Sequence, residues 1–288
     1  MTENFHRISI IGLGLVGGSW GLALREHGFR GVRVGYDRPE VSNRAHAAGA
    51  VDEITPDVSA AVREADLVIL STPVGVIVDL LPQLKAGVMP GALITDTGST
   101  KRLICHRAQE VFGNDPLFLG GHPLAGKERS GFESADAALL QNARYVLTPL
   151  KPDDFEDKRV KSFMALLELV GARPFVTDPQ THDRAMAFLS HLPQLISTGL
   201  ASMFAEQSAE DFLPAELAAS GFRDVTRLAD SPYGLWRDIC LTNIENIQSA
   251  LESLIDKLEN MKSHLSDRDL EREFKQASKL RDRLRETR

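Results

Sequence analysis

The sequence predicts an α/β protein in which a parallel, doubly wound sheet is followed by an all-helical domain. Short apolar runs alternate with helix-like segments through the first half of the chain, and a cluster of glycines follows the first apolar run. Turn signals become sparse after Asp178, where long helical patterns begin. At 288 residues the chain exceeds the size of a typical single core, so we expect two domains, residues 1–176 and 177–288.

The elements are predicted from apolar runs bounded by turn residues and from helical periodicity. Strands are expected at 8–11, 32–36, 67–71, 93–95, 118–120, 145–148 and 174–177. Helices between them are expected near 17–27, 40–48, 75–85, 99–112, 133–141 and 156–170. The second domain is expected to contain long helices at 183–205, 235–258 and 267–285. The charged C-terminal segment fits either a solvated amphipathic helix or a helix that pairs with a partner chain.

Composition argues against several classes of partner. The net charge is −7, whereas a nucleic-acid-binding surface would need an excess of basic residues. No apolar run is long enough to cross a bilayer, which argues against a membrane protein. The start MTENFHR does not have the pattern of a secretion signal, so we expect a cytoplasmic protein. Cys105 and Cys240 stand in no metal-ligand spacing, so we expect reduced structural thiols and no metal site.

A glycine-rich loop joins the first predicted strand to the first predicted helix. It fits the pattern G-x-G-x-x-G with Gly12, Leu13, Gly14, Leu15, Val16 and Gly17. In this pattern the first glycine makes the tight turn, the second lets a pyrophosphate approach the backbone, and the third packs the helix on the strand. Free N–H groups at the start of a helix attract the phosphates. We therefore expect a dinucleotide in a Rossmann-type domain, against the alternative of a glycine-rich turn without ligand.

The residues after the second and third predicted strands bear on the cofactor. Asp37 lies 20 residues after Gly17, where a carboxylate hydrogen-bonds the adenosine ribose and would repel a 2′-phosphate, so NAD is favoured over NADP. Arg38 leaves NADP open, since a guanidinium can pair with a 2′-phosphate or stack on the adenine. The next segment comprises Thr72, Pro73 and Val74. It either contacts the middle of the cofactor or ends its strand in a simple turn.

Two side chains of the first domain are candidates for the chemistry. His122 lies in the glycine-rich turn GGHPLAG after a predicted strand, at the sheet edge where ligands bind in such folds. Imidazole titrates near neutrality, so His122 can accept the hydroxyl proton when hydride leaves an alcohol carbon. Ser99, in TDTGSTK, either caps the following helix or faces the substrate.

The helical half offers candidates for binding an anion. Pro193 interrupts the helical pattern at SHLP, and a proline inside a helix bends it and frees backbone groups. Arg223 and Arg227 are four residues apart and can share one helix face. They either form a basic pocket for an anionic substrate or pair with acids on the surface.

Several motifs together identify a family. GLGLVGGS, TDTGSTK, GHPLAGKERSG, SHLP and GFRDVTRLADSP followed by WRDI occur in this order between residues 8 and 250. In this combination the chain resembles the prephenate/arogenate dehydrogenases of tyrosine biosynthesis. The resemblance implies NAD-dependent oxidation of the ring alcohol of prephenate with loss of the ring carboxylate. It also implies a nucleotide-binding domain, a helical domain that forms a homodimer, and a substrate site between the two domains.

The resemblance further implies roles for individual residues. His122 matches the catalytic histidine, and Ser99 matches the serine that helps to hold the substrate hydroxyl. His191, Arg227 and Glu128 match substrate-binding positions, with Arg227 on a carboxylate. This chain departs from the many relatives that read SHLPH, because a glutamine, Gln194, stands in place of the second imidazole.

Three alternatives remain open on the sequence. An arogenate dehydrogenase would act on a substrate whose side chain carries an amine and a carboxylate. A reductase of imines or β-hydroxy acids would share the fold but leave the HPLAG and TRLA segments unexplained. A non-catalytic NAD-binding dimer would have no reason to keep His122, Ser99 and Arg227 together.

Overall fold

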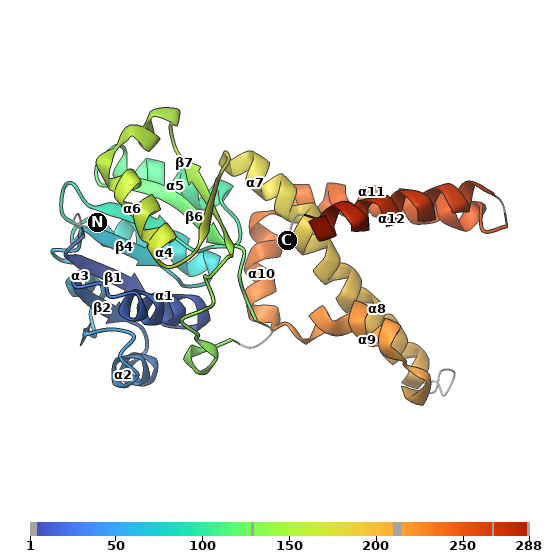
Figure 1. The fold of residues 1–288 in the computed structure, drawn as a ribbon, viewed down its shortest axis with the longest axis horizontal. Coiled ribbons are helices and arrows are strands. Elements are labelled where there is room, and N and C mark those ends of the chain that lie inside the picture. Colours follow the sequence, from blue (N-terminus) through green and yellow to red (C-terminus); the bar gives the residue numbers. More distant parts are fainter. Residues whose placement is uncertain (1–4, 128–129, 210–214, 267, 287–288) are drawn as a thin grey trace.

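The computed structural model describes residues 5–127, 130–209, 215–266 and 268–286. Figure 1 shows two parts, a sheet covered by helices and a group of long helices that extends away from it. The predicted fold class, a doubly wound sheet domain followed by helices, is confirmed. No helix in these described ranges is long and apolar enough to span a membrane.

The first part alternates strands and helices. Its strands are β1 (Arg7–Ile11), β2 (Val32–Tyr36), β3 (Glu53–Ile54), β4 (Leu67–Leu70), β5 (Leu93–Asp96), β6 (Leu117–Pro123), β7 (Arg144–Pro149) and β8 (Arg173–Val176). Its helices are α1 (Leu15–Glu26), α2 (Pro39–Ala47), α3 (Val58–Val62), α4 (Val74–Leu84), α5 (Arg102–Phe112) and α6 (Lys158–Leu169). The short elements β3 and α3 were not predicted.

The strand order is β3-β2-β1-β4-β5-β6-β7-β8. β1 pairs in parallel with both β2 and β4, so the direction of winding changes there, and ligands bind beside such a switch point. Apolar side chains on both faces hold the sheet between its helices. On β4, Leu67 and Ile69 pack into one buried cluster, whereas Val68 and Leu70 pack into the other.

The sheet is not wholly parallel, because β7 runs antiparallel to β6. The prediction of a helix at 133–141 is wrong, because the structure has only a short 3-10 turn there, at Phe132–Ser134. Asp136 accounts for the difference: its N–H donates to Ser19 Oγ at 2.9 Å and its carboxylate accepts from the Ala138 N–H at 3.0 Å. Such local bonds compete with helix formation. Without a crossover helix, the chain returns antiparallel to the strand it left.

The second part is helical throughout its described residues. Its elements are α7 (Pro179–Met186), a π turn (Ala187–His191), α8 (Leu192–Ala209), α9 (Ser220–Thr226), a 3-10 turn (Arg227–Asp230), α10 (Tyr233–Thr242), α11 (Ile244–Ser263) and α12 (Arg268–Glu286), with a further 3-10 turn at Ala215–Leu217.

Two of the long helices predicted for this part are interrupted. The helix predicted at 183–205 contains the π turn, which ends just before Pro193, so this proline lies in the first turn of α8, where a missing N–H costs little. The helix predicted at 235–258 is divided at Asn243, whose side-chain amide donates to the main-chain oxygen of Asp183 at 2.8 Å. The two interruptions meet, because Asn243 Nδ2 also lies 3.2 Å from Nδ1 of His191 in the π turn.

The helical part packs against the carboxyl edge of the sheet, with α10 next to α4 (Figure 1). The Gly75 N–H donates to Asp238 Oδ2 at 3.0 Å, and the hydroxyls of Thr100 and Thr242 lie 2.7 Å apart. These contacts bring the helices over the edge at which the parallel strands end.

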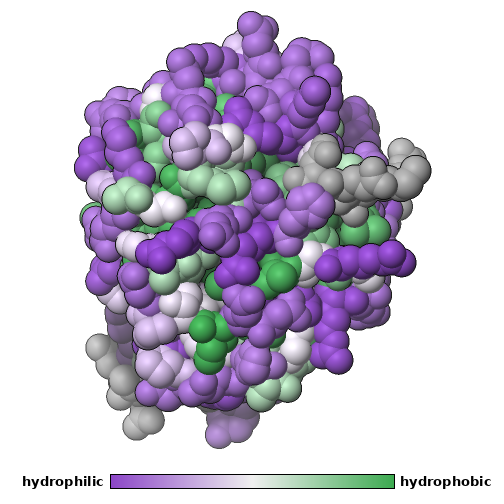
Figure 2. Space-filling model, turned by 90° about the vertical axis from the view of Figure 1, so that its left-hand side faces the viewer, coloured by the Kyte–Doolittle hydropathy of each residue, from purple (hydrophilic) through white to green (hydrophobic). Residues whose placement is uncertain are grey.

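The two parts differ in their surfaces. Figure 2 looks at the end of the molecule formed by the sheet part, which is mostly hydrophilic with small apolar areas. The helical part exposes many large apolar side chains, among them Tyr233 at 77%, Phe274 at 68% and Leu241 at 65%.

Candidate active site

Two cavities lie along the carboxyl edge of the sheet, and Thr72 lines both of them. The first has a volume of about 520 Å³ and is lined by Gly12, Asp37 and Arg38, among others. The second has a volume of about 340 Å³ and extends from the glycine loop to the helical part. Its lining includes most of the residues predicted for the middle of the cofactor and for the chemistry: Gly14, Leu15, Val16, Pro73, Val74, Ser99 and His122.

The glycine loop has the geometry that its sequence predicts. Gly12 has φ +92°, and a side chain there would meet the Ser71 carbonyl oxygen at 2.4 Å. A side chain at Gly17 would meet the Gly12 carbonyl oxygen at 1.9 Å, so α1 approaches β1 closely. By contrast, a side chain at Gly14 would meet no protein atom within 4 Å. Because Gly14 lines the second cavity, a side chain there would occupy space in that cavity and would not collide with the protein.

Asp37 has two roles at the end of β2. It lines the first cavity, and its Oδ2 accepts a hydrogen bond from the Leu13 N–H at 2.7 Å while Oδ1 accepts from the Arg38 N–H at 2.6 Å. The same carboxylate that is predicted to face a ribose therefore also braces the glycine loop. The Arg38 side chain is 82% exposed at the rim, with Nε 3.9 Å from Asp37 Oδ1.

The residues present fit a dinucleotide across the two cavities. The start of α1 follows Gly14 and directs helix N–H groups toward the second cavity, which suits a pyrophosphate. The Thr72 hydroxyl oxygen is buried and has no hydrogen-bond partner among the described residues, although the residue borders both cavities. Leu13 and Gly17, also predicted at this site, are buried beneath the loop.

The structure separates the two roles considered for Ser99. The helix predicted from residue 99 begins at Arg102, and its start is capped by Asp183 of α7, whose two carboxylate oxygens accept from the Lys101 and Arg102 N–H groups at 2.7 and 2.9 Å. The Ser99 side chain does not cap α5 but lines the second cavity with His122.

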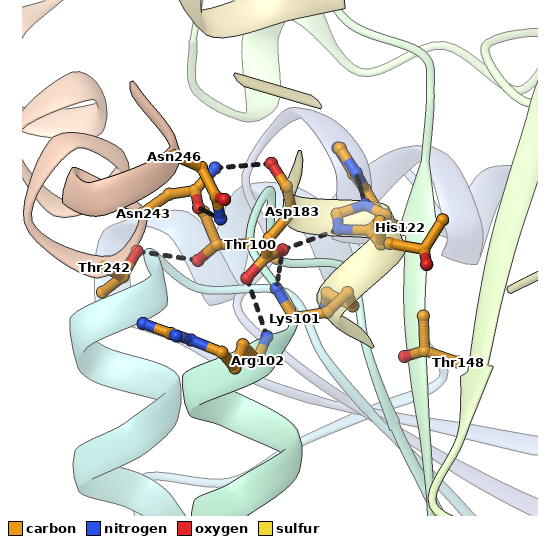
Figure 3. A network of polar contacts seen from close by, with 12 residues as sticks. Thr100, Lys101, Arg102, His122, Thr148, Asp183, Thr242, Asn243 and Asn246 are labelled. Atoms are coloured by element: carbon orange, nitrogen blue, oxygen red, sulfur yellow. Dashed lines mark hydrogen bonds and ion pairs between the residues drawn. The ribbon is translucent and has the colours of Figure 1, made fainter. Parts of the chain in front are cut away.

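His122 lies at the end of β6 with its ring on the second cavity. Its Nδ1 is 2.9 Å from Nε2 of His182, and Nδ1 of His182 is 2.7 Å from Oδ1 of Asp183. Figure 3 shows the Asp183 carboxylate beside Lys101 and Arg102 at the start of α5. His182 and Asp183 are both buried. Neither residue was singled out in the sequence, where they occur as a plain His-Asp pair near the start of a helix.

His122 was expected in a turn, but β6 extends to Pro123, so this histidine lies in the strand. A buried ion pair supports this end of β6. The Lys101 ammonium contacts the Asp96 carboxylate and donates to the Gly121 carbonyl oxygen at 2.7 Å, and Asp96 Oδ1 accepts from the Gly121 N–H at 3.1 Å. Both charged side chains are fully buried. Because both main-chain groups of Gly121 are held, the position of the next residue, His122, is closely defined.

Burial lowers the pKa of His122 well below its usual 6.5, and the neighbouring His182, Lys101 and His191 lower that pKa further. The imidazole is therefore neutral at neutral pH and has a lone pair to offer to a proton. A neutral base beside a dinucleotide site is the arrangement needed to take a hydroxyl proton as hydride leaves the same carbon.

Two of the remaining predicted substrate-binding residues, His191 and Arg227, are not among the described residues that line the second cavity. His191 is buried in the π turn, where Asn243 Nδ2 lies 3.2 Å from its Nδ1, and burial lowers its pKa to about 4. Arg227 is exposed at the start of a 3-10 turn that leads into Ser231 and Pro232 of the cavity wall. Glu128 lies outside the described residues.

Lys127 is a candidate that the sequence did not single out. It lines the second cavity, and its ammonium is 3.0 Å from Asp136 Oδ2. The signal was present in the GHPLAGK stretch, where a basic residue follows His122 within the same turn. Gln194, at the departure from the family pattern, is buried and donates to the Leu228 carbonyl oxygen at 2.7 Å, so its amide braces the segment that follows Arg227.

Comparison with known proteins agrees with this geometry. Residues 20–176 match the model of the prephenate dehydrogenase nucleotide-binding domain, and residues 178–280 match the model of the prephenate dehydrogenase dimerization domain. A prephenate dehydrogenase of Lactococcus lactis is 35% identical over 263 residues, which are 91% of this chain and 70% of that protein.

Two solved structures are similar over nearly the whole chain. The prephenate dehydrogenase of Aquifex aeolicus, in complex with hydroxyphenyl propionate and NAD+, superposes with a TM-score of 0.89 at 31% identity, covering 97% of this chain and 98% of that one. The arogenate dehydrogenase of Synechocystis has a TM-score of 0.80 at 30% identity, covering 96% and 99%. With a nucleotide-binding sheet domain, a neutral histidine at its edge and these matches, the chain belongs to the prephenate dehydrogenase family.

Proposed function

We propose that this protein is an NAD-dependent prephenate dehydrogenase, which oxidises the ring alcohol of prephenate and releases CO2 to give 4-hydroxyphenylpyruvate. The observation that carries the proposal is the second cavity, which is lined by the glycine loop, by Ser99 and by a neutral His122. A hydride acceptor, a hydroxyl-binding group and a proton acceptor must all reach one carbinol, and this cavity holds the residues for each.

NAD would lie across the two cavities. The start of α1 would bind its pyrophosphate, Asp37 would bind the adenosine ribose, and the segment Thr72–Val74 would contact the middle of the cofactor. When bound, NAD supplies the acceptor for the hydride. The carboxylate of Asp37 favours the unphosphorylated ribose, which supports NAD over NADP.

The protein would contribute position and one proton acceptor. Ser99 would hydrogen-bond the substrate hydroxyl, and His122 would take its proton as the hydride leaves. The resulting dienone loses its carboxylate because the ring becomes aromatic, so this step needs no further acid or base. We assign Arg227, His191 and Glu128 to substrate binding on the family resemblance, and we add Lys127 because it is a cation on the cavity wall.

We further propose that residues 1–176 form the NAD-binding domain and that residues 177–288 bind substrate and form a homodimer. The matched dimerization domain and the exposed apolar side chains of the helical part support this division. The hairpin of α11 and α12 extends away from the sheet part (Figure 1), as a helix pair that packs against a second copy would.

Arogenate is a second candidate substrate, which the similarity to the Synechocystis arogenate dehydrogenase supports. The test is to follow NADH formation with prephenate and with arogenate, each at saturating NAD, and to compare kcat/KM. Faster turnover of prephenate supports the proposal. A preference for arogenate would reassign the substrate, and no NADH from either would overturn the proposed activity.

A further inference from the structure

A chain of hydrogen bonds runs from the second cavity to a buried carboxylate. It begins at His122 Nδ1, passes over 2.9 Å to His182 Nε2, and continues from His182 Nδ1 over 2.7 Å to Asp183 Oδ1. The two imidazole rings meet edge to face, with ring centroids 5.1 Å apart. His122 alone borders the second cavity, and the other two residues lie behind it.

The acceptor at the far end determines where each proton lies. Asp183 Oδ1 also accepts from the Lys101 N–H and Oδ2 accepts from the Arg102 N–H, so both carboxylate oxygens act as acceptors. The bond from His182 Nδ1 must therefore be donated by the ring, which leaves Nε2 of a neutral His182 as an acceptor. His122 must then carry its own proton on Nδ1, because that nitrogen faces the His182 acceptor.

We propose that His182 and Asp183 are positioning residues that hold His122 in the tautomer with hydrogen on Nδ1, so that Nε2 is the atom that takes the substrate proton. The inference rests on the proposed function only for the identity of the reacting hydroxyl. During oxidation the O–H bond breaks and its proton bonds to Nε2, while the hydride with its electron pair passes from the carbinol carbon to the nicotinamide. His122 becomes an imidazolium whose Nδ1–H still donates to His182.

Asp183, which fixes this tautomer through His182, also makes contacts that hold the helices around the site. Asp183 caps α5, which follows Ser99, and its main-chain oxygen accepts from Asn243 at the start of α11. It thus lies where α5, α7 and α11 meet. Without the hydrogen bond to His182, His122 would be free to place hydrogen on Nε2 or to rotate. Either change removes the lone pair of Nε2 from the cavity.

Other charged and titratable groups also face this chain, and they matter for any pH measurement. The Lys101 ammonium, paired with Asp96, and the buried His191 both lower the pKa of His122. We therefore expect activity to fall when the His122 imidazole becomes charged, because it then has no lone pair for the substrate proton.

The direct test reads the tautomer without turnover. The whole protein is labelled with nitrogen-15 histidine, and long-range proton–nitrogen spectra report which ring nitrogen of each of its eight histidines carries hydrogen. Signals of His122 are assigned from their loss in His122→Asn. We expect hydrogen on Nδ1 and a bare Nε2 in the wild type, and a mixture that includes the opposite tautomer in His182→Leu. Hydrogen on Nε2 of wild-type His122 would overturn the proposal.

The second test compares two replacements of one residue. His182→Leu removes the acceptor, whereas the amide oxygen of His182→Gln can replace Nε2 as an acceptor for the His122 Nδ1–H. We expect kcat to fall roughly 10- to 100-fold in the leucine variant and to stay within about fivefold of wild type in the glutamine variant, with the KM for NAD unchanged in both. His106→Gln, on an exposed histidine of α5, is the matched control.

Several outcomes distinguish positioning from packing. Equal losses of kcat in the two His182 variants would overturn the proposal, because a purely structural role gains nothing from the glutamine amide. Unchanged kcat and an unchanged pH profile in His182→Leu would overturn it as well. If wild-type protein oxidises neither prephenate nor arogenate, the proposed function fails, yet the tautomer spectra still test the hydrogen-bond chain.

Discussion

Replacing His122 by asparagine tests the proton acceptor most directly. The Nδ1 of His122 lies 2.9 Å from Nε2 of His182, and His122 lines the second cavity. An asparagine amide ends near the position of Nδ1, so it can keep the bond to His182 but has no group at the position of Nε2. The substitution therefore removes the base while keeping a polar contact at the end of β6.

The expected loss is set by the value of a positioned base. General base catalysis contributes on the order of 100- to 10,000-fold to the rate, which corresponds to about 3 to 5 kcal/mol of transition-state free energy. The hydrogen bond that His122 makes outside the cavity is conserved in the variant, so the free energy of unfolding should change by only about 1 kcal/mol. We therefore expect kcat to fall at least about 100-fold while NAD affinity stays within about twofold.

The assay follows NADH absorbance with prephenate at saturating NAD, and NAD affinity is measured separately by titration. Because burial, together with His182, Lys101 and His191, lowers the pKa of His122, the wild-type acid limb of kcat/KM should lie below pH 6.5, and that limb should be absent from the residual activity of the variant. His106→Asn serves as the control, since that side chain is 73% exposed.

Two results would refute the role of His122. Near-normal turnover in a variant that is shown to be folded would exclude it as the proton acceptor. Loss of NAD affinity with little change in the chemical step would instead identify His122 as a structural residue of the turn.

Four further predictions follow from the site. Asp37→Asn keeps an acceptor for the Leu13 N–H but removes the charge, so the kcat/KM preference for NAD over NADP should shrink about tenfold or more; an unchanged preference would make another residue responsible. Arg227→Ala should raise the substrate KM at least tenfold with NAD affinity unchanged, whereas the neighbouring Arg223→Ala should not, and the reverse pattern would disprove the assignment. Light scattering at micromolar concentration should report a dimer, and a monomer would contradict it. Burial lowers the pKa of His191 to about 4, so the stability that comes from keeping this imidazole neutral is complete above pH 6.5 and is lost between about pH 6.5 and 4. In His191→Gln the free energy of unfolding should therefore fall less over that pH window, by on the order of 3 kcal/mol. An equally steep fall in the variant would disprove the role of His191.

Parts of the site that depend on neighbouring residues could be predicted from the sequence. The glycine loop is a local structure, because a tight turn after a strand and an open helix start need particular residues at fixed spacings. Asp37 follows from the same unit, and His122 and Ser99 follow from the rule that strand ends of a parallel sheet meet at one edge. These residues line the two cavities, although their roles in catalysis remain predictions.

Local pattern failed where a side chain changes the backbone. The helix predicted at 133–141 does not form because Asp136 bonds to nearby and distant partners instead. The helix predicted at 99–112 begins only at Arg102, where Asp183 caps it. Periodicity also could not divide the helix at Asn243, whose side chain bonds to Asp183. In each case the deciding hydrogen bond joins residues that helical periodicity does not relate.

By itself the sequence determined the fold class, the dinucleotide loop and the position of a histidine at the sheet edge. These features depend on the periodicity of apolar residues and on the spacing of glycines, which are set within a few residues of the chain. Only the tertiary structure decided what stands behind that histidine. His182 and Asp183 are 60 and 61 residues from His122, and α7 brings them to it only because the helical part packs over the ends of the strands. Contacts of that separation depend on how whole elements pack, and no spacing along the chain encodes them.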